Sequence, residues 1–130
     1  RITDNDVLSN AGPGVRVVQG AVTVTGNRLV GNGEDGVRLD RSDARITDNL
    51  VRASAGAGIR VDEGWALVSG NLVLAGGGDG VVVVASGSRE TAPSRVLDNR
   101  IVDNCGVAIR FRAGTAVVLD NTVRGNAGCE

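Results

Sequence analysis

The chain has 130 residues, a formal net charge of −1 and a hydrophobic content of 42%. This length fits one compact domain or a piece of a longer one, and the near-zero charge gives no reason to expect a nucleic-acid partner or attraction to a charged membrane surface. No apolar run approaches the roughly 18 residues of a membrane span. The chain contains no His, Tyr, Lys or Met, which excludes acid–base chemistry by His or Tyr and Schiff-base chemistry by Lys.

The chain contains an internal repeat, and each repeat unit has an asparagine at the same position. This residue recurs at Asn5, Asn27, Asn49, Asn71, Asn99 and Asn121. The steps are 22 residues, except for one step of 28 between the fourth and fifth. An aliphatic residue lies three positions before each Asn, and another lies two positions after it. Such a repeat indicates a solenoid, in which each rung buries its apolar face only by stacking on its neighbours.

Each rung predicts three short strands. In the first complete rung these are, in chain order, Val15–Val17, Val22–Thr25 and Arg28–Val30. The first two strands alternate aliphatic and polar residues, so their aliphatic side chains point to one face and their polar side chains to the other. Gly, Asn, Asp and Ser, which favour turns, separate the strands. The first strand recurs at residues 37–39, 59–61, 81–83 and 109–111.

A rung of 22 residues with three strands is too short for a βαβ unit and too long for a hexapeptide coil, but it fits a right-handed parallel β-helix. The recurring pattern of aliphatic residue, Asp or Gly, Asn, second aliphatic residue and second Asn is seen in Ile2–Asn10 and Val24–Asn32. In this pattern the chain resembles the small repeat form of the pectate-lyase-like superfamily. We expect an all-β solenoid, a right-handed parallel β-helix of six rungs with three short parallel sheets.

The domain organisation follows from the repeat. We expect residues 1–130 to form a single β-helix domain that is a segment of a longer solenoid, with flanking rungs or caps in the parent protein. The 28-residue step holds six extra residues. We place them in an inserted loop, residues 85–94. In the enzymes that the chain resembles, loops beside one parallel sheet build the substrate cleft; the alternative is a surface insertion without a role.

The candidate binding residues begin with a column of arginines, one per rung, which Val82 interrupts. Asp40 and Asp62 follow two residues after arginines on the same outward face. Guanidinium groups can bind the carboxylates or hydroxyls of a sugar chain, whereas the alternative is a solvated face with weak cross-strand ion pairs. The candidate substrate-binding residues are Arg16, Arg38, Arg60, Arg110, Asp40 and Asp62, with Arg89 and Glu90 of the inserted loop.

No cofactor or protein-held metal is expected, with Ca²⁺ at the paired Asp40 and Asp62 as the only candidate. A second row of acids, Asp4, Asp48, Asp98 and Asp120, precedes the asparagines. It could supply an acid–base pair of the kind glycosidases use. These acids alternate with Gly26 and Gly70 at a turn, so we favour a role in capping backbone groups.

Two further features leave alternatives open. Cys105 and Cys129 lie in turns of adjacent rungs and could form a disulfide, stay as two buried thiols, or leave Cys129 free. Outward aliphatic side chains form a possible strip for a partner or self-association, or are scattered surface residues. The strip residues are Leu67, Leu97, Val117 and Leu119, near Trp65.

The resemblance implies a protein that is extracellular or periplasmic. It implies polysaccharide lyase or glycoside hydrolase chemistry if the protein is an enzyme, but this segment holds no complete catalytic set, so the question of activity stays open. We predict a carbohydrate-binding or carbohydrate-processing β-helix segment of a secreted bacterial protein that recognises a polysaccharide. The alternative is a non-catalytic structural or scaffold module, such as a spacer, a surface protein or a periplasmic accessory protein.

Overall fold

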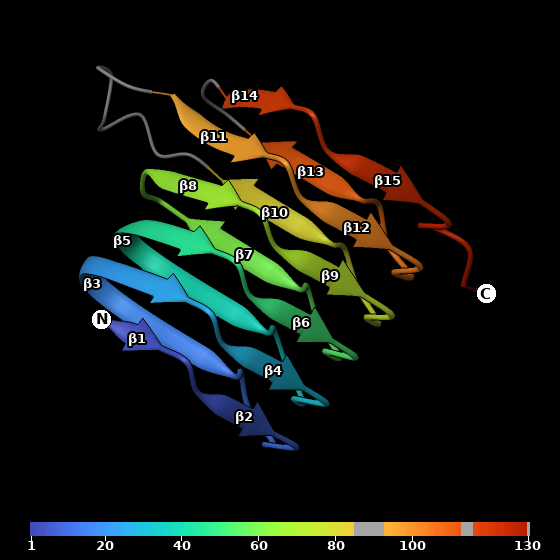
Figure 1. The fold of residues 1–130 in the computed structure, drawn as a ribbon, viewed down its shortest axis with the longest axis horizontal. Coiled ribbons are helices and arrows are strands. Elements are labelled where there is room, and N and C mark those ends of the chain that lie inside the picture. The colour runs from blue at the N-terminus through green and yellow to red at the C-terminus, as the bar shows by residue number, and fades with distance from the viewer. Residues whose placement is uncertain (85–92, 113–115, 130) are drawn as a thin grey trace.

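The computed structural model describes residues 1–84, 93–112 and 116–129. Over these residues the chain is an all-β parallel solenoid without helices (Figure 1), which confirms the predicted fold class. Each strand pairs in parallel with a strand one rung away, so that equivalent repeat positions stack directly; Ile46, for example, lies between Val24 and Val68. The described part contains no helix with the length and hydropathy needed to cross a bilayer.

The strands of the described residues form two hydrogen-bonded sheets. One sheet holds one strand per rung: β2 (Asp6–Leu8), β4 (Arg28–Val30), β6 (Leu50–Arg52), β9 (Leu72–Leu74), β12 (Arg100–Val102) and β15 (Thr122–Arg124). The other holds β1 (Ile2–Thr3), β3 (Val15–Thr25), β5 (Val37–Thr47), β7 (Ile59–Asp62), β8 (Ala66–Ser69), β10 (Val81–Val84), β11 (Ser94–Leu97), β13 (Ile109–Arg112) and β14 (Ala116–Leu119).

The predicted three segments per rung are therefore present, but two of the three faces are joined into one sheet. The reason is that β3 and β5 run without a break around the corner between these faces. Each turns that corner through a single left-handed residue, Gln19 with φ 55° and Arg41 with φ 51°. The next rung divides into two separate strands, β7 and β8, on either side of the corner.

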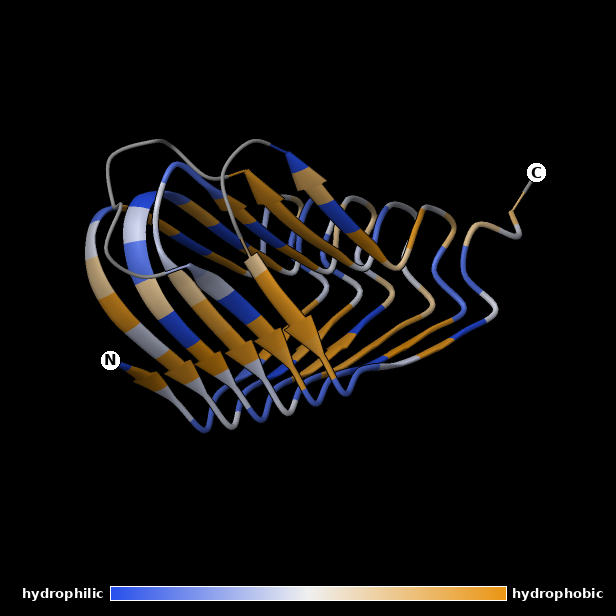
Figure 2. Cartoon of the chain, turned by 90° about the horizontal axis from the view of Figure 1, so that it is seen from above, coloured by the Kyte–Doolittle hydropathy of each residue, from blue (hydrophilic) through white to orange (hydrophobic). Residues whose placement is uncertain are grey.

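The core fills the space between the faces with aliphatic side chains from β1 to β13. Figure 2 shows apolar and polar residues alternating along the strands, as the period of two requires. The fully buried members include Leu29, Ile46, Ile59 and Ile101. Burial of one such side chain contributes about 1.5–3 kcal/mol relative to leaving it in water. The core thus supplies the main driving force for stacking one rung on the next.

A ladder of asparagines fills the corner before the six-stranded sheet. The Asn71 side-chain oxygen accepts hydrogen bonds from the backbone N–H of Asn49 at 3.0 Å and from its side-chain amide at 2.9 Å. The Asn49 amide also donates to the carbonyl oxygen of Val24 at 2.9 Å. The same pattern runs from Asn5 to Asn121. Each Asn therefore satisfies a backbone N–H that the parallel sheets leave unpaired, as we predicted.

The acids that precede this ladder occupy strained corner positions. Asp4, Asp48, Asp98 and Asp120 have φ values of 54–57°, a left-handed conformation that Asp tolerates better than most residues. Gly26 and Gly70 take the same conformation in the intervening rungs, and a side chain on either would collide with the carboxylate of the rung before. Backbone geometry and carboxylate packing therefore explain the glycines at Gly26 and Gly70, whereas Asp98 and Asp120 occupy consecutive rungs.

The inserted residues enter the rung of β10 and β11. Strand register places Val84 opposite Asp62, a separation of 22, but Arg95 opposite Leu67, a separation of 28. The six extra residues therefore lie between Val84 and Arg95. Trp65 donates from its ring nitrogen to the carbonyl oxygen of Pro93 at 2.9 Å, which fixes the chain as it re-enters the solenoid.

Gly14, Gly36, Gly58 and Gly80 directly precede β3, β5, β7 and β10, and the space around these glycines shows how tightly the rungs pack. A Cβ on Gly58 would collide with the Val73 side chain and lie 2.8 Å from the Gly80 carbonyl oxygen, whereas a Cβ on Gly20 meets nothing within 4 Å. We expect Gly58→Ala to lower the free energy of unfolding by about 1–3 kcal/mol through overpacking. Gly20→Ala should change it by less than about 0.5 kcal/mol. Urea unfolding followed by circular dichroism measures both, and equal effects would contradict the packing argument.

The asparagine ladder predicts a larger cost at its centre than at its end. Asn49→Ala removes the acceptor of the Asn27 backbone and side-chain N–H groups inside the protein. We expect a loss of about 2–5 kcal/mol, because each buried unpaired donor costs about 1–3 kcal/mol. Asn5→Ala, on the exposed first rung, should cost less because water can replace the lost bonds. Equal losses in urea unfolding would show that the ladder does not act through buried donors.

Candidate functional site

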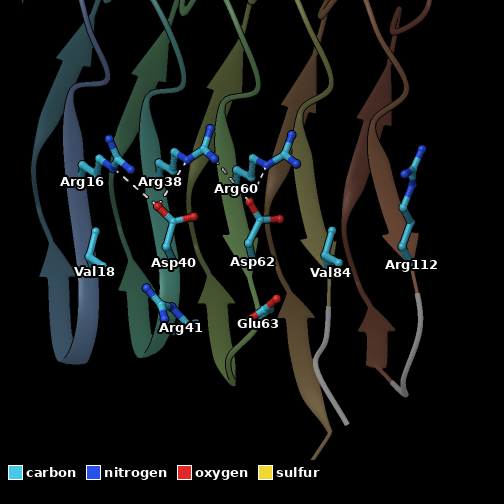
Figure 3. A pocket seen from close by; sticks show the side chains of 10 residues that line it. All are labelled: Arg16, Val18, Arg38, Asp40, Arg41, Arg60, Asp62, Glu63, Val84 and Arg112. Atoms are coloured by element: carbon cyan, nitrogen blue, oxygen red, sulfur yellow. Dashed lines mark hydrogen bonds and ion pairs between the residues drawn. The ribbon is translucent and has the colours of Figure 1, made fainter. Parts of the chain in front are cut away.

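The candidate site lies on the outward face of five stacked strands, where two rows of side chains run across the rungs. In strand register, the first row is Arg16, Arg38, Arg60, Val82 and Arg110. The second row is Val18, Asp40, Asp62, Val84 and Arg112. The strands alternate, so these side chains point outward while their neighbours fill the core. Figure 3 shows side chains of both rows lining one hollow.

The two rows line a shallow groove that runs along the solenoid. One hollow of about 450 Å³ extends from Arg16 to Arg112, and a second of about 320 Å³ reaches Asp79 and Arg110. Both share Arg60, Val84 and Arg112, so they form one continuous depression. We call this depression the arginine groove. Its length along the stack suits an extended ligand better than a compact one.

Ion pairs link the first three rungs of the arginine groove. Asp40 contacts the Nε atoms of both Arg16 and Arg38 at 3.4 Å. Asp62 contacts the Nε atom of Arg60 at 2.8 Å and the Nη2 atom of Arg38 at 3.8 Å. The bond to Asp62 raises the pKa of Arg60 above its ordinary value. Each acid therefore bridges two rungs, which offsets the repulsion between arginines stacked about 4.8 Å apart.

A cross-rung pair closes the far end of the groove. Asp79 precedes β10, yet its carboxylate accepts from the Nε atom of Arg110 in the next rung and from the Val107 backbone N–H at 2.8 Å. The guanidinium bond is the main reason that the pKa of Asp79 lies below its ordinary value and that of Arg110 above. Asp35 occupies the equivalent corner two rungs earlier, where it accepts from the Ala57 N–H at 2.8 Å.

The structure brings six predicted site residues into this groove: Arg16, Arg38, Arg60, Arg110, Asp40 and Asp62. The other two, Arg89 and Glu90, lie outside the described residues. The carboxylates considered for Ca²⁺, Asp40 and Asp62, contact guanidinium groups instead. Within residues 1–84, 93–112 and 116–129, no group of three or more His, Cys, Asp or Glu side chains gathers as a metal site.

Sequence reasoning missed five residues that line the groove. Arg112, Val18 and Val84 occupy the row position of Asp40 and Asp62, so the period of two within each strand could have identified them. Arg41 and Glu63 stand one residue farther on, at corners with φ values of 51° and 55°. No sequence signal placed these two, because a left-handed corner residue breaks the alternation that the prediction relied on.

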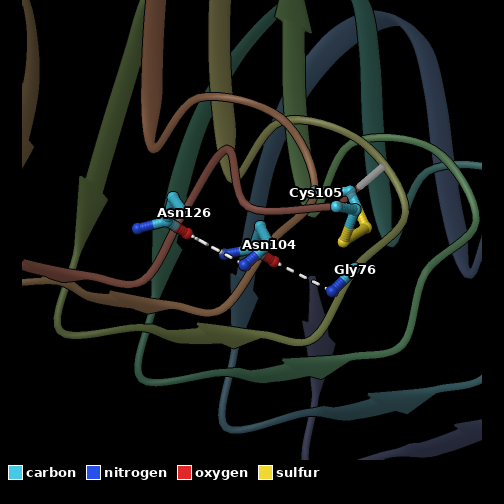
Figure 4. Close-up of a disulfide and its surroundings, with 5 residues drawn as sticks. Gly76, Asn104, Cys105 and Asn126 are labelled. Atoms are coloured by element: carbon cyan, nitrogen blue, oxygen red, sulfur yellow. Dashed lines mark hydrogen bonds between the residues drawn. A yellow bond between two sulfur atoms is a disulfide. The ribbon is translucent and has the colours of Figure 1, made fainter.

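Cys105 and Cys129 form a disulfide between adjacent rungs, with a Cα–Cα distance of 4.7 Å (Figure 4). The sequence left this pairing open. Beside it, Asn104 donates from its side-chain amide to the oxygen of Asn126 at 2.9 Å, as part of a second, shorter asparagine ladder. The disulfide thus ties the final described turn to the rung before it.

The outward aliphatic residues do not form one continuous strip. Leu67 pairs with Arg45 on one side and Arg95 on the other. Leu97 and Leu119 are direct neighbours, and Val117 follows Arg95. Trp65 lies near the polar end of this surface, where the Arg45 guanidinium sits 5.7 Å from its ring centroid. Self-association through these residues stays a prediction.

The pair of Asp79 and Arg110 predicts a specific acid sensitivity. Because the pKa of Asp79 is lowered by folding, its contribution to stability is complete above the unfolded value of about 3.9 and disappears as pH falls through the folded value. Asp79→Asn should therefore be less stable than wild type at pH 7, and the difference should shrink as the pH falls below about 4.

Thermal unfolding between pH 2.5 and 7 measures this difference. Arg110→Gln should produce the same flattening of the acid limb, and the double variant should add little to either single change, because both remove one interaction. A wild-type acid limb in Arg110→Gln would contradict the assignment of the shift to this pair.

The family comparison agrees with the architecture. The family described as the right-handed beta helix region matches residues 1–130. No curated protein and no solved structure matches the chain. The family match covers the whole chain, and its fold is the parallel solenoid that the strand register displays. The chain therefore belongs to the right-handed beta helix family, as its repeat predicted.

Proposed function

We propose that this chain is a carbohydrate-binding β-helix module of a protein that works outside the cytoplasm. The observation that carries the proposal is the arginine groove, a continuous depression lined by hydrogen-bonding side chains from five rungs. The rungs repeat about every 4.8 Å, which is close to the length of one sugar residue in an extended glycan. Arginine side chains at equivalent positions of neighbouring rungs can therefore bind successive sugar residues with the same geometry.

The side chains of the groove suit sugar recognition. Guanidinium groups present several N–H donors in a fixed plane, and sugar hydroxyls can accept these bonds. Arg16 has 57% of its side chain exposed, and Arg60 and Arg110 have about two fifths exposed, so their outer nitrogens reach solvent. A rigid sheet holds them in place, which limits the entropy lost on binding.

The disulfide between Cys105 and Cys129 supports a location outside the cytoplasm. Disulfides form and persist in extracellular and periplasmic compartments, whereas cytosolic thiols are kept reduced. The resemblance to secreted β-helix proteins points the same way. We therefore propose that the module reaches an oxidising compartment, where polysaccharides of cell surfaces are accessible.

We propose binding rather than catalysis as the role of the described residues. Glycoside hydrolysis uses a carboxylic acid with a raised pKa as proton donor. In the groove the pKa of Asp79 is shifted downward by Arg110, which makes it a poor proton donor near neutral pH. Asp40 and Asp62 are already engaged by guanidinium groups of the protein.

A structural module is the second candidate. The observation in its favour is that the acids and the four arginines of the first row pair with one another without any ligand. In this case the only role of the face would be to stabilise the stacked rungs. Exposed ion pairs that form a network make a modest contribution to folding stability. A module of this kind would act as a spacer or scaffold and would bind no glycan.

A glycan array probed with the purified chain distinguishes the two candidates. Binding should be present in the wild type and fall at least about tenfold in Arg38→Ala and Arg60→Ala, a loss of about 1.4 kcal/mol. Arg28→Ala and Arg100→Ala, at the exposed first positions of β4 and β12 in the six-stranded sheet, are matched controls that should bind normally. Circular dichroism checks that each variant folds. The absence of any glycan signal for the wild type would favour the structural module.

A further inference from the structure

We infer that the arginine groove recognises a neutral glycan through its hydroxyl groups rather than an anionic polyuronate. This inference rests on the proposed carbohydrate-binding function and specifies its ligand class. The evidence is the way in which the protein's own carboxylates occupy the arginines. A groove built to hold a polyanion would leave its cationic groups free.

Each arginine of the first row already has a carboxylate partner. The Nε atoms of Arg16, Arg38, Arg60 and Arg110 all contact an Asp oxygen. Arg38 also contacts Asp35 through Nη1 and Asp62 through Nη2, so its three nitrogens all face acids. The side-on edge of a guanidinium, which pairs Nε with one Nη, is a preferred grip on a carboxylate. In this groove that edge is turned toward the protein.

The groove also offers acceptors, which a carboxylate ligand cannot use. All ion pairs of Asp40 and Asp62 run through their Oδ2 atoms. Within the described part of the chain, their Oδ1 atoms make no further hydrogen bond, and the side chains keep 18% and 19% exposure. A sugar hydroxyl can donate to such an oxygen and accept from a neighbouring Nη–H. A uronate carboxylate can only accept, and it would be repelled by Asp40 and Asp62.

The balance of charge leads to the same ligand class. Six arginines line the two hollows, together with four acidic residues, and Asp35 contacts Arg38 from the adjoining corner. The positive charge is thus largely offset where the ligand would lie, and long-range attraction of a polyanion is weak. Of the six arginines that line the hollows, four have an acid within ion-pair distance among the described residues, and the other two, Arg41 and Arg112, do not.

Valines supply apolar contacts in the same depression. Val82 and Val84 replace Arg and Asp in the fourth rung, and Val18, which is 47% exposed, lies at the first. Neutral sugars combine C–H surfaces with hydroxyl groups, so an alternation of valines with Arg–Asp pairs matches both features.

Titration calorimetry with matched hexasaccharides tests this inference. The probes are gluco-, galacto- and manno-configured neutral hexamers and their uronate counterparts, each measured at 50 and 500 mM NaCl. We expect at least one neutral hexamer to bind about tenfold or more tightly than its uronate counterpart, with a Kd that changes less than about threefold with salt. Tighter uronate binding that weakens steeply with salt would overturn the inference but leave carbohydrate binding intact. No binding by any hexamer would overturn both.

Substitution of the acids provides an independent test. Asp62→Asn removes a carboxylate acceptor and leaves the guanidinium groups of Arg38 and Arg60 without this partner. The affinity for neutral hexamers should therefore fall, while the affinity for uronate hexamers should rise. Asp98→Asn makes the same change of net charge at a corner outside the groove and should alter neither. If Asp62→Asn lowers the affinity for neutral and for uronate hexamers by the same factor, with an unchanged unfolding temperature, the acids do not select against carboxylates.

Discussion

The structure depends on the hydrogen bond from one asparagine to the asparagine directly above it. A parallel β-helix must turn sharp corners three times per rung, and each corner leaves backbone N–H groups without a strand partner. The side-chain oxygen of the Asn in the next rung accepts two hydrogen bonds, one from that backbone N–H and one from the side-chain amide of the same residue. Asn71 accepts both bonds from Asn49 in this way. This bond requires rungs in strict register, and the register in turn determines which residues lie above one another everywhere else.

This register also determines which charged side chains lie next to one another on the outer face. Because equivalent positions stack, one Arg per rung becomes a column, and Asp40 and Asp62 fall between its members. A stack of arginines alone would be repulsive, so the acids are needed for stability before any ligand is considered. The same pairing leaves the side chains of Arg16, Arg60 and Arg110 partly exposed to solvent. A structural requirement of the stack thus shapes the binding properties that we propose for the groove.

The breaks in the repeat carry information that the repeat itself lacks. In the second asparagine ladder, Asn32 is followed by Ser54 and Gly76 before Asn104 resumes the pattern. The Ser54 hydroxyl is buried and has no hydrogen-bond partner among the residues that the structure describes, so the ladder is locally weaker there. On the outer face the break falls one rung later, where Val82 replaces Arg. Ser54 lies near the middle of the chain, and Val82 lies in the rung that carries the inserted residues.

The sequence by itself determined the solenoid, its rung length, its core residues and the composition of its outer face, because a fixed period of 22 and an alternation of two are local patterns that stacking only repeats. Contacts between non-equivalent positions needed the tertiary structure. Asp79 reaches Arg110 across rungs, Cys105 pairs with Cys129 despite their different places in the repeat, and Arg41 turns a corner that joins two faces into one sheet. Such contacts join positions that are not equivalent in the repeat, so neither the period of 22 nor the alternation of two predicts them, and only the three-dimensional path of the chain brings these side chains together.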